Sequence, residues 1–420
     1  MNAGTRIPLV ARPDHVPPER VVDWDIYDPP QAREIGPHLA WKKLHDGPDI
    51  VWTAHNGGHW IVTRGEDVDF LQRNHDPFSM QDIGVPHGTK PMRLLPLESD
   101  PPEHGGFRAI IAPWFSPKKV DSLKGCTVEL ARELIEGLYP RGECEFFKEF
   151  AQHLPIAIFC KLADVPWADR EMLLEWTEWT TRGQSPELRV RAHHNMIGYI
   201  TRLIPERRAR PGDDLLSAVV NARIGGQPLA EQDIISMMLV LLFGGLDTVA
   251  SSMSFITHFL ATHPEHVKQL IADPKIIPHA IDEMMRRFAV SSTARTLTRD
   301  YEYKGLSFKS GDKVFVQPMM YGLDDRKFER PLEVDYTRAS VIHAGFGAGP
   351  HRCPGSFLAR MEIKVFLEEW LQRIPEFRVK PGEHVTYLPG IVNCIGRLPL
   401  SWPVKSEANR LLRLEPGSPR

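Results

Sequence analysis

The pattern of apolar and polar positions predicts a mostly helical middle of the chain, from about residue 116 to residue 271. Apolar side chains recur with the helical period over 120–138 and again over 185–203. The longest helical candidate is 231–262, which would extend about 45 Å at the rise of an α-helix. A helix of that length can cross a whole domain, so we expect it to form the centre of the fold.

The strand-like segments are short and lie on either side of this helical region. The turn sequence Asn56-Gly57-Gly58 joins the first two of them and is typical of a hairpin. After Arg295 the pattern of apolar and polar residues changes and predicts short strands, a Gly-rich loop and then an amphipathic helix over 354–374. The predicted strands are 50–53, 59–63, 301–303, 306–308 and 313–317.

No internal repeat and no linker divides the chain. We therefore predict a single domain over residues 1–420, mainly α (α+β), with small β-sheets at its edges. The N-terminal part would carry one sheet region, and the helix-rich core would occupy about residues 100–300. The Gly-rich loop and the helix after it would occupy about residues 341–374.

Charge and hydropathy exclude several classes of protein. The 51 Lys and Arg against 54 Asp and Glu give a formal charge of −3, which argues against a nucleic-acid binder. The most apolar window, 234–246, is too short to span a bilayer and belongs in the centre of a large fold. The first 20 residues are interrupted by proline and do not resemble a signal peptide. We expect a cytoplasmic protein without a membrane segment.

The five cysteines form neither a disulfide framework nor a zinc motif, because their number is odd and their spacing wide. Four of them are expected to be reduced, small apolar residues: Cys126, Cys144, Cys160 and Cys394. The fifth, Cys353, lies in the Gly-rich loop FGAGPHRCPG of residues 346–355.

Pro354 suits the first position of a helix, which would place Cys353 at the N-cap, where unpaired N–H groups and the helix dipole stabilise a thiolate. The neighbouring glycines allow a flat ligand to approach the backbone closely. A thiolate presented in this way suits a haem iron as its axial ligand. From these residues alone, a buried structural cysteine remains an alternative, and a phosphate-binding loop is a weaker one because no Lys follows the glycines.

The loop fits the pattern F-x-x-G-x-x-x-C-x-G at Phe346, Gly349, Cys353 and Gly355. This pattern resembles the haem-binding signature of the cytochrome P450 haem-thiolate monooxygenases. Three more segments are similar to that family's motifs, in its order: 100–108 (DPPEHGGFR), 244–248 (GGLDT) and 283–286 (EMMR). Four further segments, 56–65, 241–255, 373–377 and 390–402, look like the camphor-hydroxylating bacterial branch.

The resemblance implies haem b (iron protoporphyrin IX), with Cys353 as the axial ligand of the iron. It also implies a set of residues around the haem, although each of them taken singly has an ordinary structural interpretation such as an exposed Arg or a turn His. Phe346, Gly349 and Gly244 would contact the ring. The residues on propionate-binding positions are His104, Arg108, Arg295 and His351.

Glu283 and Arg286 resemble the pair that braces this family's fold behind the haem, whereas any helix can carry such a pair on its solvated face. The third member of the brace is left open by the sequence. Glu333 stands where an Arg or His is usual, and Arg338 is the possible substitute.

Asp247 and Thr248 interrupt an otherwise apolar helix, which suits dioxygen activation in a site that excludes water. The Thr248 hydroxyl can bond a nearby backbone carbonyl and open the helix ladder, leaving a groove for oxygen beside Gly244. By the resemblance, Thr248 would bind the oxygen ligand and its water, and Asp247 would relay protons. The alternative for this pair is an ordinary helix surface or a cap.

Electrons are expected to come from outside, because the chain has no flavin or nicotinamide fingerprint and no Fe–S cysteine spacing. The resemblance implies NADH, a reductase and a small acidic 2Fe–2S ferredoxin. Arg108 and Arg360 are the candidate docking cations. Gly105 and Ser340 stand where the branch would have basic residues, so the partner could differ.

The family's recognition segments imply an apolar substrate pocket, although each of its residues could equally be plain core. Met92 falls where camphor hydroxylation relies on a Tyr hydroxyl, which argues against camphor and for an apolar terpenoid or norisoprenoid. The predicted pocket residues are Met92, Leu94, Leu97, Val240, Phe243, Val290, Ile391 and Val392.

The resulting prediction is a monomeric haem-thiolate monooxygenase that uses dioxygen. A haem-thiolate peroxygenase or isomerase and a non-enzymatic haem sensor are the alternatives. The Asp247-Thr248 pair favours the monooxygenase, because the other classes do not need a proton relay.

Overall fold

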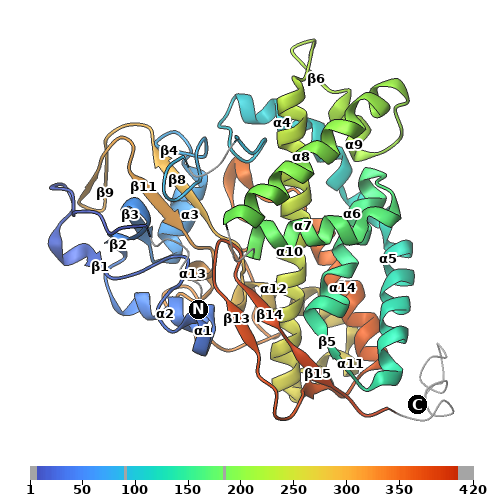
Figure 1. The fold of residues 1–420 in the computed structure, drawn as a ribbon. Coiled ribbons are helices and arrows are strands. Elements are labelled where there is room, and N and C mark those ends of the chain that lie inside the picture. The colour runs from blue at the N-terminus through green and yellow to red at the C-terminus, as the bar shows by residue number, and fades with distance from the viewer. Residues whose placement is uncertain (1–6, 89–91, 183–185, 405–420) are drawn as a thin grey trace.

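The computed structural model of the chain describes residues 7–88, 92–182 and 186–404. Helices dominate the half of the molecule shown in green, yellow and red, and the longest of them, α10, runs through its middle (Figure 1). The helices are α1 (Ala32–Ile35), α2 (Pro37–Lys42), α3 (Gly65–Arg73), α4 (Glu103–Ile111), α5 (Pro117–Leu138), α6 (His153–Ala163), α7 (Arg170–Arg182), α8 (Pro186–Ala209), α9 (Leu215–Val220), α10 (Glu231–Thr262), α11 (Pro264–Ala272), α12 (Ile277–Arg287), α13 (Met319–Gly322) and α14 (Ser356–Arg373).

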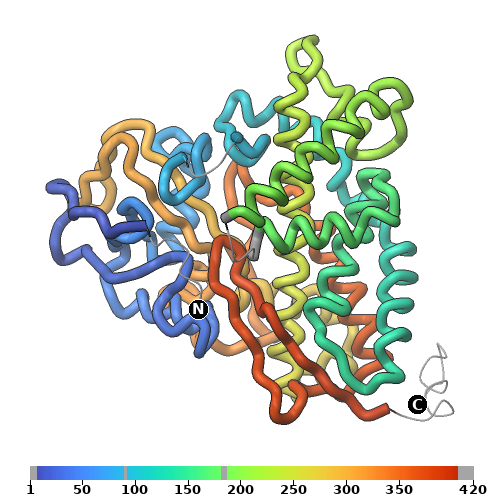
Figure 2. The backbone as a smooth tube through the Cα atoms, viewed as in Figure 1, coloured from blue at the N-terminus to red at the C-terminus, as the bar shows by residue number. Residues whose placement is uncertain are grey.

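The largest sheet brings the N-terminal part of the chain against a segment that follows α12. Its strand order is β1-β2-β3-β11-β8-β4, and the blue and orange parts of the chain therefore lie side by side (Figure 2). The predicted hairpin is confirmed, since β2 and β3 pair antiparallel. The strands are β1 (Val21–Val22), β2 (Ile50–Thr53), β3 (His59–Val62), β4 (Phe78–Ser79), β8 (Thr293–Leu297) and β11 (Lys313–Val316).

The remaining strands form small sheets, of which the β9–β10 hairpin packs beside the six-stranded sheet rather than at the helical part (Figure 1). Their orders are β12-β15-β5, β13-β14, β10-β9 and β6-β7. These strands are β5 (Glu143–Glu145), β6 (Arg223–Ile224), β7 (Gln227–Pro228), β9 (Tyr301–Tyr303), β10 (Leu306–Phe308), β12 (Arg378–Val379), β13 (Thr386–Leu388), β14 (Cys394–Arg397) and β15 (Pro399–Ser401). The fold is helix-rich with small sheets, and the predicted fold class is confirmed.

The predicted central helix has the predicted bounds, 231–262. By length and composition α10 could cross a membrane, with a mean hydropathy of 1.9 over its most apolar window, yet 67% of that window is buried inside the protein. It is therefore a core helix. The helix predicted over 185–203 is α8, which extends to Ala209; Ser185 itself lies outside the described residues.

Three apolar clusters fill the interior, and α10 contributes to two of them. Its first half packs with α6 and α9, and its second half packs with α12 and α14. The third cluster covers the six-stranded sheet. The candidate site lies where the first two clusters meet, because side chains of both line one cavity.

Candidate active site

A cavity between α10 and α14 brings together most of the chemistry-bearing residues predicted from the sequence. Cys353 and Phe346 lie on the α14 side, and Gly244 and Thr248 lie on the α10 side. The propionate candidates also line it: His104, Arg108, Arg295 and His351. These residues come from four segments of the chain, and the cavity has mostly apolar walls between them.

The loop before α14 is held in a turn that points Cys353 into the cavity. The Cys353 N–H donates to the Phe346 carbonyl at 2.8 Å, and Arg352 N–H donates to the Gly349 carbonyl at 3.2 Å. Gly349 has a φ of +68°, and a Cβ there would lie 2.5 Å from the Gln72 carbonyl oxygen. Only glycine lets the loop lie this close to α3.

The predicted N-cap position of Cys353 is wrong. α14 starts at Ser356 with Gly355 as its N-cap, because Pro354 and Gly355 form an extra turn before the helix. Burial raises the pKa of the Cys353 thiol, while the Gly355 backbone and the guanidinium groups of Arg108 and Arg360 oppose that rise. Nearby cations and one backbone contact, rather than an N-cap position, therefore offset part of the cost of a buried thiolate in this chain.

Four basic side chains gather at one edge of the cavity. The rings of His104 and His351 lie 4.4 Å apart between centroids, and Arg108 donates to the Arg352 carbonyl. Arg295, on β8, is 3% exposed and donates to Thr293 Oγ1 and the Ala294 carbonyl at 3.1 Å each. Burial lowers the pKa of Arg295 to about 10, and burial together with the neighbouring basic groups lowers that of His351 to about 3.

The acidic residue that acts on this cluster is Asp100, whose charge opposes the lowering of the pKa of Arg295 and of His104 without forming an ion pair with either among the described residues. Among the described residues, no ion pair involves Arg108 or Arg295. The Nε2 atom of His351 is buried without a hydrogen-bond partner. Buried cations are normally paired, so this edge of the cavity suits the carboxylates of a ligand.

On the opposite wall, α10 presents a polar turn to the cavity. The Thr248 hydroxyl donates to the Gly244 carbonyl at 2.8 Å, as predicted. The predicted opening of the helix is not seen, because α10 continues through this turn as α-helix. A Cβ at Gly244 would meet no atom within 4 Å, which leaves space beside the turn. Asp247 is 4% exposed and Thr248 half-buried.

A family model described as cytochrome P450 matches residues 179–389. The probable cytochrome P450 127A1 of Sinorhizobium fredii is 32% identical over 400 residues, covering 93% of this chain and 96% of that protein. The chain belongs to the cytochrome P450 family. Crystal structures of CYP101J2 and CYP101C1, 37% and 39% identical, superpose with a TM-score of 0.87 each; both alignments cover 94% of this chain and 100% of the other. The predicted family and its bacterial branch are confirmed.

Membership of the P450 family makes the protein a monooxygenase and implies a haem, a bound substrate, dioxygen and a redox partner. The residues present fit a haem. The orphaned His351 Nε2 and the unpaired Arg108 and Arg295 suit its two carboxylates, and Cys353 lies in the same cavity.

The brace behind the cavity is complete, and its third member is Arg338. Glu283 and Arg286, both fully buried, form a two-pronged ion pair at 2.8 and 2.9 Å. Arg338 Nε donates to Glu283 Oε1 at 3.0 Å. Glu333 contributes only its backbone carbonyl, which Arg286 contacts at 2.8 Å, while its side chain pairs with the exposed Arg330.

Only part of the predicted substrate pocket lines the cavity. Leu97, Val240 and Val290 do, and the sequence missed further apolar residues there: Met80, Ile111, Phe115, Phe159 and Leu358. The other five predicted residues lie elsewhere. Met92 and Phe243 pack on a core cluster, Leu94 is half-buried, Ile391 is 41% exposed, and Val392 bridges Ser291.

Glu362 is a residue that sequence reasoning missed. It lines the cavity from α14, is 2% exposed, and its Oε2 has no partner. Burial raises the pKa of Glu362 to about 8, so the carboxyl is protonated at neutral pH. The sequence feature that could have identified Glu362 is its position on the apolar face of the predicted helix, between Ala359 and Phe366.

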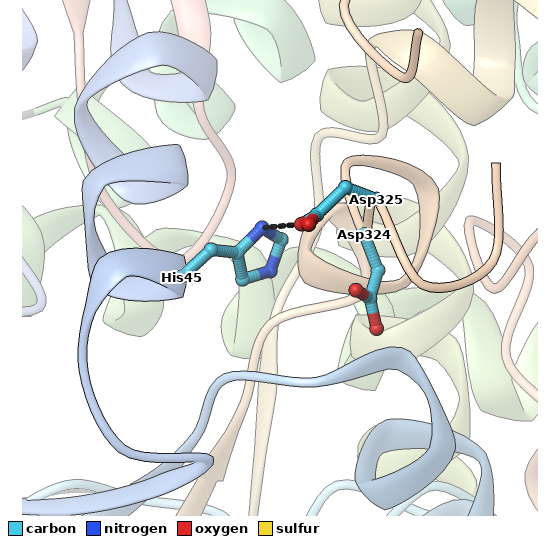
Figure 3. Close-up of side chains that lie close together, drawn as sticks. All are labelled: His45, Asp324 and Asp325. Atoms are coloured by element: carbon cyan, nitrogen blue, oxygen red, sulfur yellow. Dashed lines mark ion pairs between the residues drawn. The ribbon is translucent and has the colours of Figure 1, made fainter. Parts of the chain in front are cut away.

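One of two clusters of possible metal ligands that lie outside the cavity among the described residues is formed by His45, Asp324 and Asp325 (Figure 3). Cations of the chain already occupy it. Arg64 pairs with both carboxylates at 3.1 and 3.2 Å, and Lys42 pairs with Asp325 at 2.9 Å. This cluster is therefore an ion-pair network that joins the segment before β2 to the turn after α13.

Proposed function

We propose that this P450 hydroxylates an apolar small molecule of terpenoid or norisoprenoid type, using dioxygen and two electrons. The observation that carries the proposal is one apolar cavity that holds Cys353, the unpaired basic cluster and the Gly244–Thr248 turn. A haem bound there supplies the oxidising chemistry once dioxygen and electrons are delivered.

The chain's own part is to hold substrate, exclude water and move protons. We propose that the Thr248 hydroxyl, anchored on the Gly244 carbonyl, would hold a water molecule in the cavity and that Asp247, buried next to it on α10, would relay protons from solvent. Leu97, Val240 and Val290 would give the substrate an apolar wall without a fixed polar anchor. Such a wall supports an apolar substrate.

Replacing Thr248 by Ala tests the proton step. We expect the variant to keep consuming dioxygen but to divert most of it to peroxide, measured as product formed per NADH oxidised. Thr262→Ala is the matched control, because Thr262 makes the same bond to a carbonyl four residues earlier, at the far end of α10. If Thr248→Ala forms as much product per NADH oxidised as the wild type, Thr248 has no role in the proton step.

A screen of substrate-induced spin shifts tests the substrate class. Ionone-like ketones and other terpenoids are expected to bind more tightly than camphor, because no Tyr hydroxyl lies in the recognition segment. Tight binding of camphor with weak binding of ionone-like ketones contradicts this class. Cys353→His is expected to abolish the red-shifted carbon-monoxide band of the reduced protein, and its survival would overturn the ligand assignment.

We propose that electrons pass from NADH through a reductase and a 2Fe–2S ferredoxin that docks near Arg108 and Arg360. Arg360 is partly neutralised by Asp282 at 2.7 Å, whereas Arg352 is exposed and forms no ion pair among the described residues. Phe357, 50% exposed and four residues after Cys353, adds an apolar contact. These features support a partner with few acidic contacts.

We further propose that residues 1–420 act as one haem-enclosing, cytoplasmic and monomeric unit. The alternatives are a haem-thiolate peroxygenase or isomerase and a non-enzymatic haem sensor. Turnover with a surrogate ferredoxin separates them, since only the monooxygenase needs external electrons. The polar turn at Thr248 supports the monooxygenase.

A further inference from the structure

Ser236 differs from the other hydroxyl residues of α10 in where its hydrogen bonds go. Thr248, Ser252 and Ser254 each donate to a carbonyl of their own helix, four residues earlier. Ser236 is 2% exposed, and its hydroxyl bonds a separate segment of the chain. It donates to the Arg93 carbonyl at 2.5 Å and accepts the Leu95 N–H at 2.7 Å.

The segment that Ser236 holds, residues 92–99, is also fixed from its other side. Glu98, 2% exposed, accepts the Ile83 and Leu94 N–H groups at 3.0 and 2.9 Å. The Arg93 guanidinium donates to the Glu98 carbonyl at 2.8 Å and pairs with Glu103, at the start of α4, at 2.7 Å. The segment therefore has a defined internal shape that α10 can position as a unit.

This segment forms part of the cavity wall. Pro96 and Leu97 line the cavity, and so does Val240, one helical turn after Ser236. We propose that Ser236 is a positioning residue for substrate recognition, whose hydroxyl holds residues 92–99 against α10 and so sets the wall that Pro96 and Leu97 give to the cavity. This inference rests on the proposed function only in taking the cavity as the substrate site.

The physical basis is the cost of leaving buried backbone groups unbonded. Without the hydroxyl, the Arg93 carbonyl and the N–H of Leu95, itself 2% exposed, lose their partner unless the segment moves into water. The population in which residues 92–99 lie against α10 would then fall roughly tenfold relative to arrangements in which the segment has moved away. Leu97 would no longer face the cavity from a fixed position.

The test compares Ser236→Ala with Ser254→Ala in the haem-loaded full chain. Ser254 is the matched control, because it is fully buried on the same helix and donates only to the Ala250 carbonyl. Hydrogen exchange of peptides covering 92–99 should rise roughly tenfold in Ser236→Ala and stay unchanged in Ser254→Ala. Association and dissociation of the probe 4-phenylimidazole should both quicken, and Ser236→Thr should restore both readouts.

Unchanged exchange over 92–99 in Ser236→Ala would overturn the proposal, and so would a rise spread equally along α10, which indicates general destabilisation. If Ser236→Ala does not yield folded protein, Ser236→Cys gives the same comparison with a weaker hydrogen-bonding group. Neither readout needs turnover, so failure here is distinguishable from failure of the monooxygenase assignment, which Thr248→Ala and ferredoxin-supported turnover test.

Discussion

Two groups of ionisable residues, the brace and the basic cluster, differ in how completely they are paired. In the brace, Glu283, Arg286 and Arg338 satisfy one another and nearby backbone carbonyls. In the basic cluster, Arg295 donates hydrogen bonds only to neutral oxygens, and His351 Nε2 has no hydrogen-bond partner among the described residues. Each group has buried members (Glu283 and Arg286; His104 and Arg295) and half-buried ones, so burial alone does not separate the groups.

The difference indicates which group serves the fold and which serves a ligand. A buried charge is costly unless it is paired, so an unpaired one that lines a cavity is a candidate for pairing with a ligand. The brace is complete without any ligand, and so it stabilises the protein itself. We propose that the carboxylates of a haem complete the basic cluster. Removing a member of each group should therefore produce different losses.

The largest effect is expected from Glu283→Gln, which leaves Arg286 and Arg338 buried without a counter-charge. We expect the free energy of unfolding of the haem-loaded protein to fall by about 3–5 kcal/mol, followed by circular dichroism in urea. Glu333→Gln is the control, because its side chain pairs only with exposed Arg330 and should cost less than about 1 kcal/mol. Equal losses would contradict the assignment of Arg338 as the third member.

Arg295→Met should act on haem retention rather than on the fold. The loss of a charge-assisted bond to a haem carboxylate is expected to speed haem transfer to excess apomyoglobin about 10- to 100-fold, with helix content unchanged. Arg287→Met is the control, because Arg287 is also buried but donates to the Leu332 carbonyl and does not line the cavity. Slow haem transfer from Arg295→Met would show that Arg295 does not hold the cofactor.

Local patterns predicted much of this molecule, and contacts between distant segments account for what they missed. The bounds of α10 follow from a long apolar run, and the β2–β3 hairpin follows from Asn56-Gly57-Gly58. The partner of Glu283 could not be chosen from sequence, because Arg338 reaches it across 55 residues of chain.

The errors at the site have local physical causes. One extra turn at Pro354 and Gly355 moved the start of α14 away from Cys353. The pocket residues carried over from the family depended on the register of loops, and five of the eight do not line the cavity. Loop positions of this kind are set by tertiary bonds such as those of Ser236, which no periodicity reveals.

The smallest effect is expected at Glu362, which extends the comparison to a buried acid. It has no ion-pair partner among the described residues and, being acidic, cannot pair with a haem carboxylate. Its pKa is raised by burial from 4.5 to about 8, so the folded protein stays protonated where the unfolded chain ionises. Stability from this group is therefore lost as pH rises from about 4.5 to 8. Glu362→Gln should remove that loss, and its free energy of unfolding should exceed that of the wild type by about 1 kcal/mol at pH 5 and about 2 kcal/mol at pH 6.

Glu369→Gln on the same helix is the matched variant for this measurement. Glu369 is also buried, but it pairs with Arg132 at 2.9 Å and with Arg373 at 2.5 Å. Because those cations lose their counter-charge, Glu369→Gln should lower the free energy of unfolding where Glu362→Gln raises it. Urea titrations of both haem-loaded variants at pH 5, 6 and 7 measure whether each change raises or lowers the free energy of unfolding. A Glu362→Gln difference that does not grow with pH would mean that the pKa of Glu362 is not raised in the folded protein.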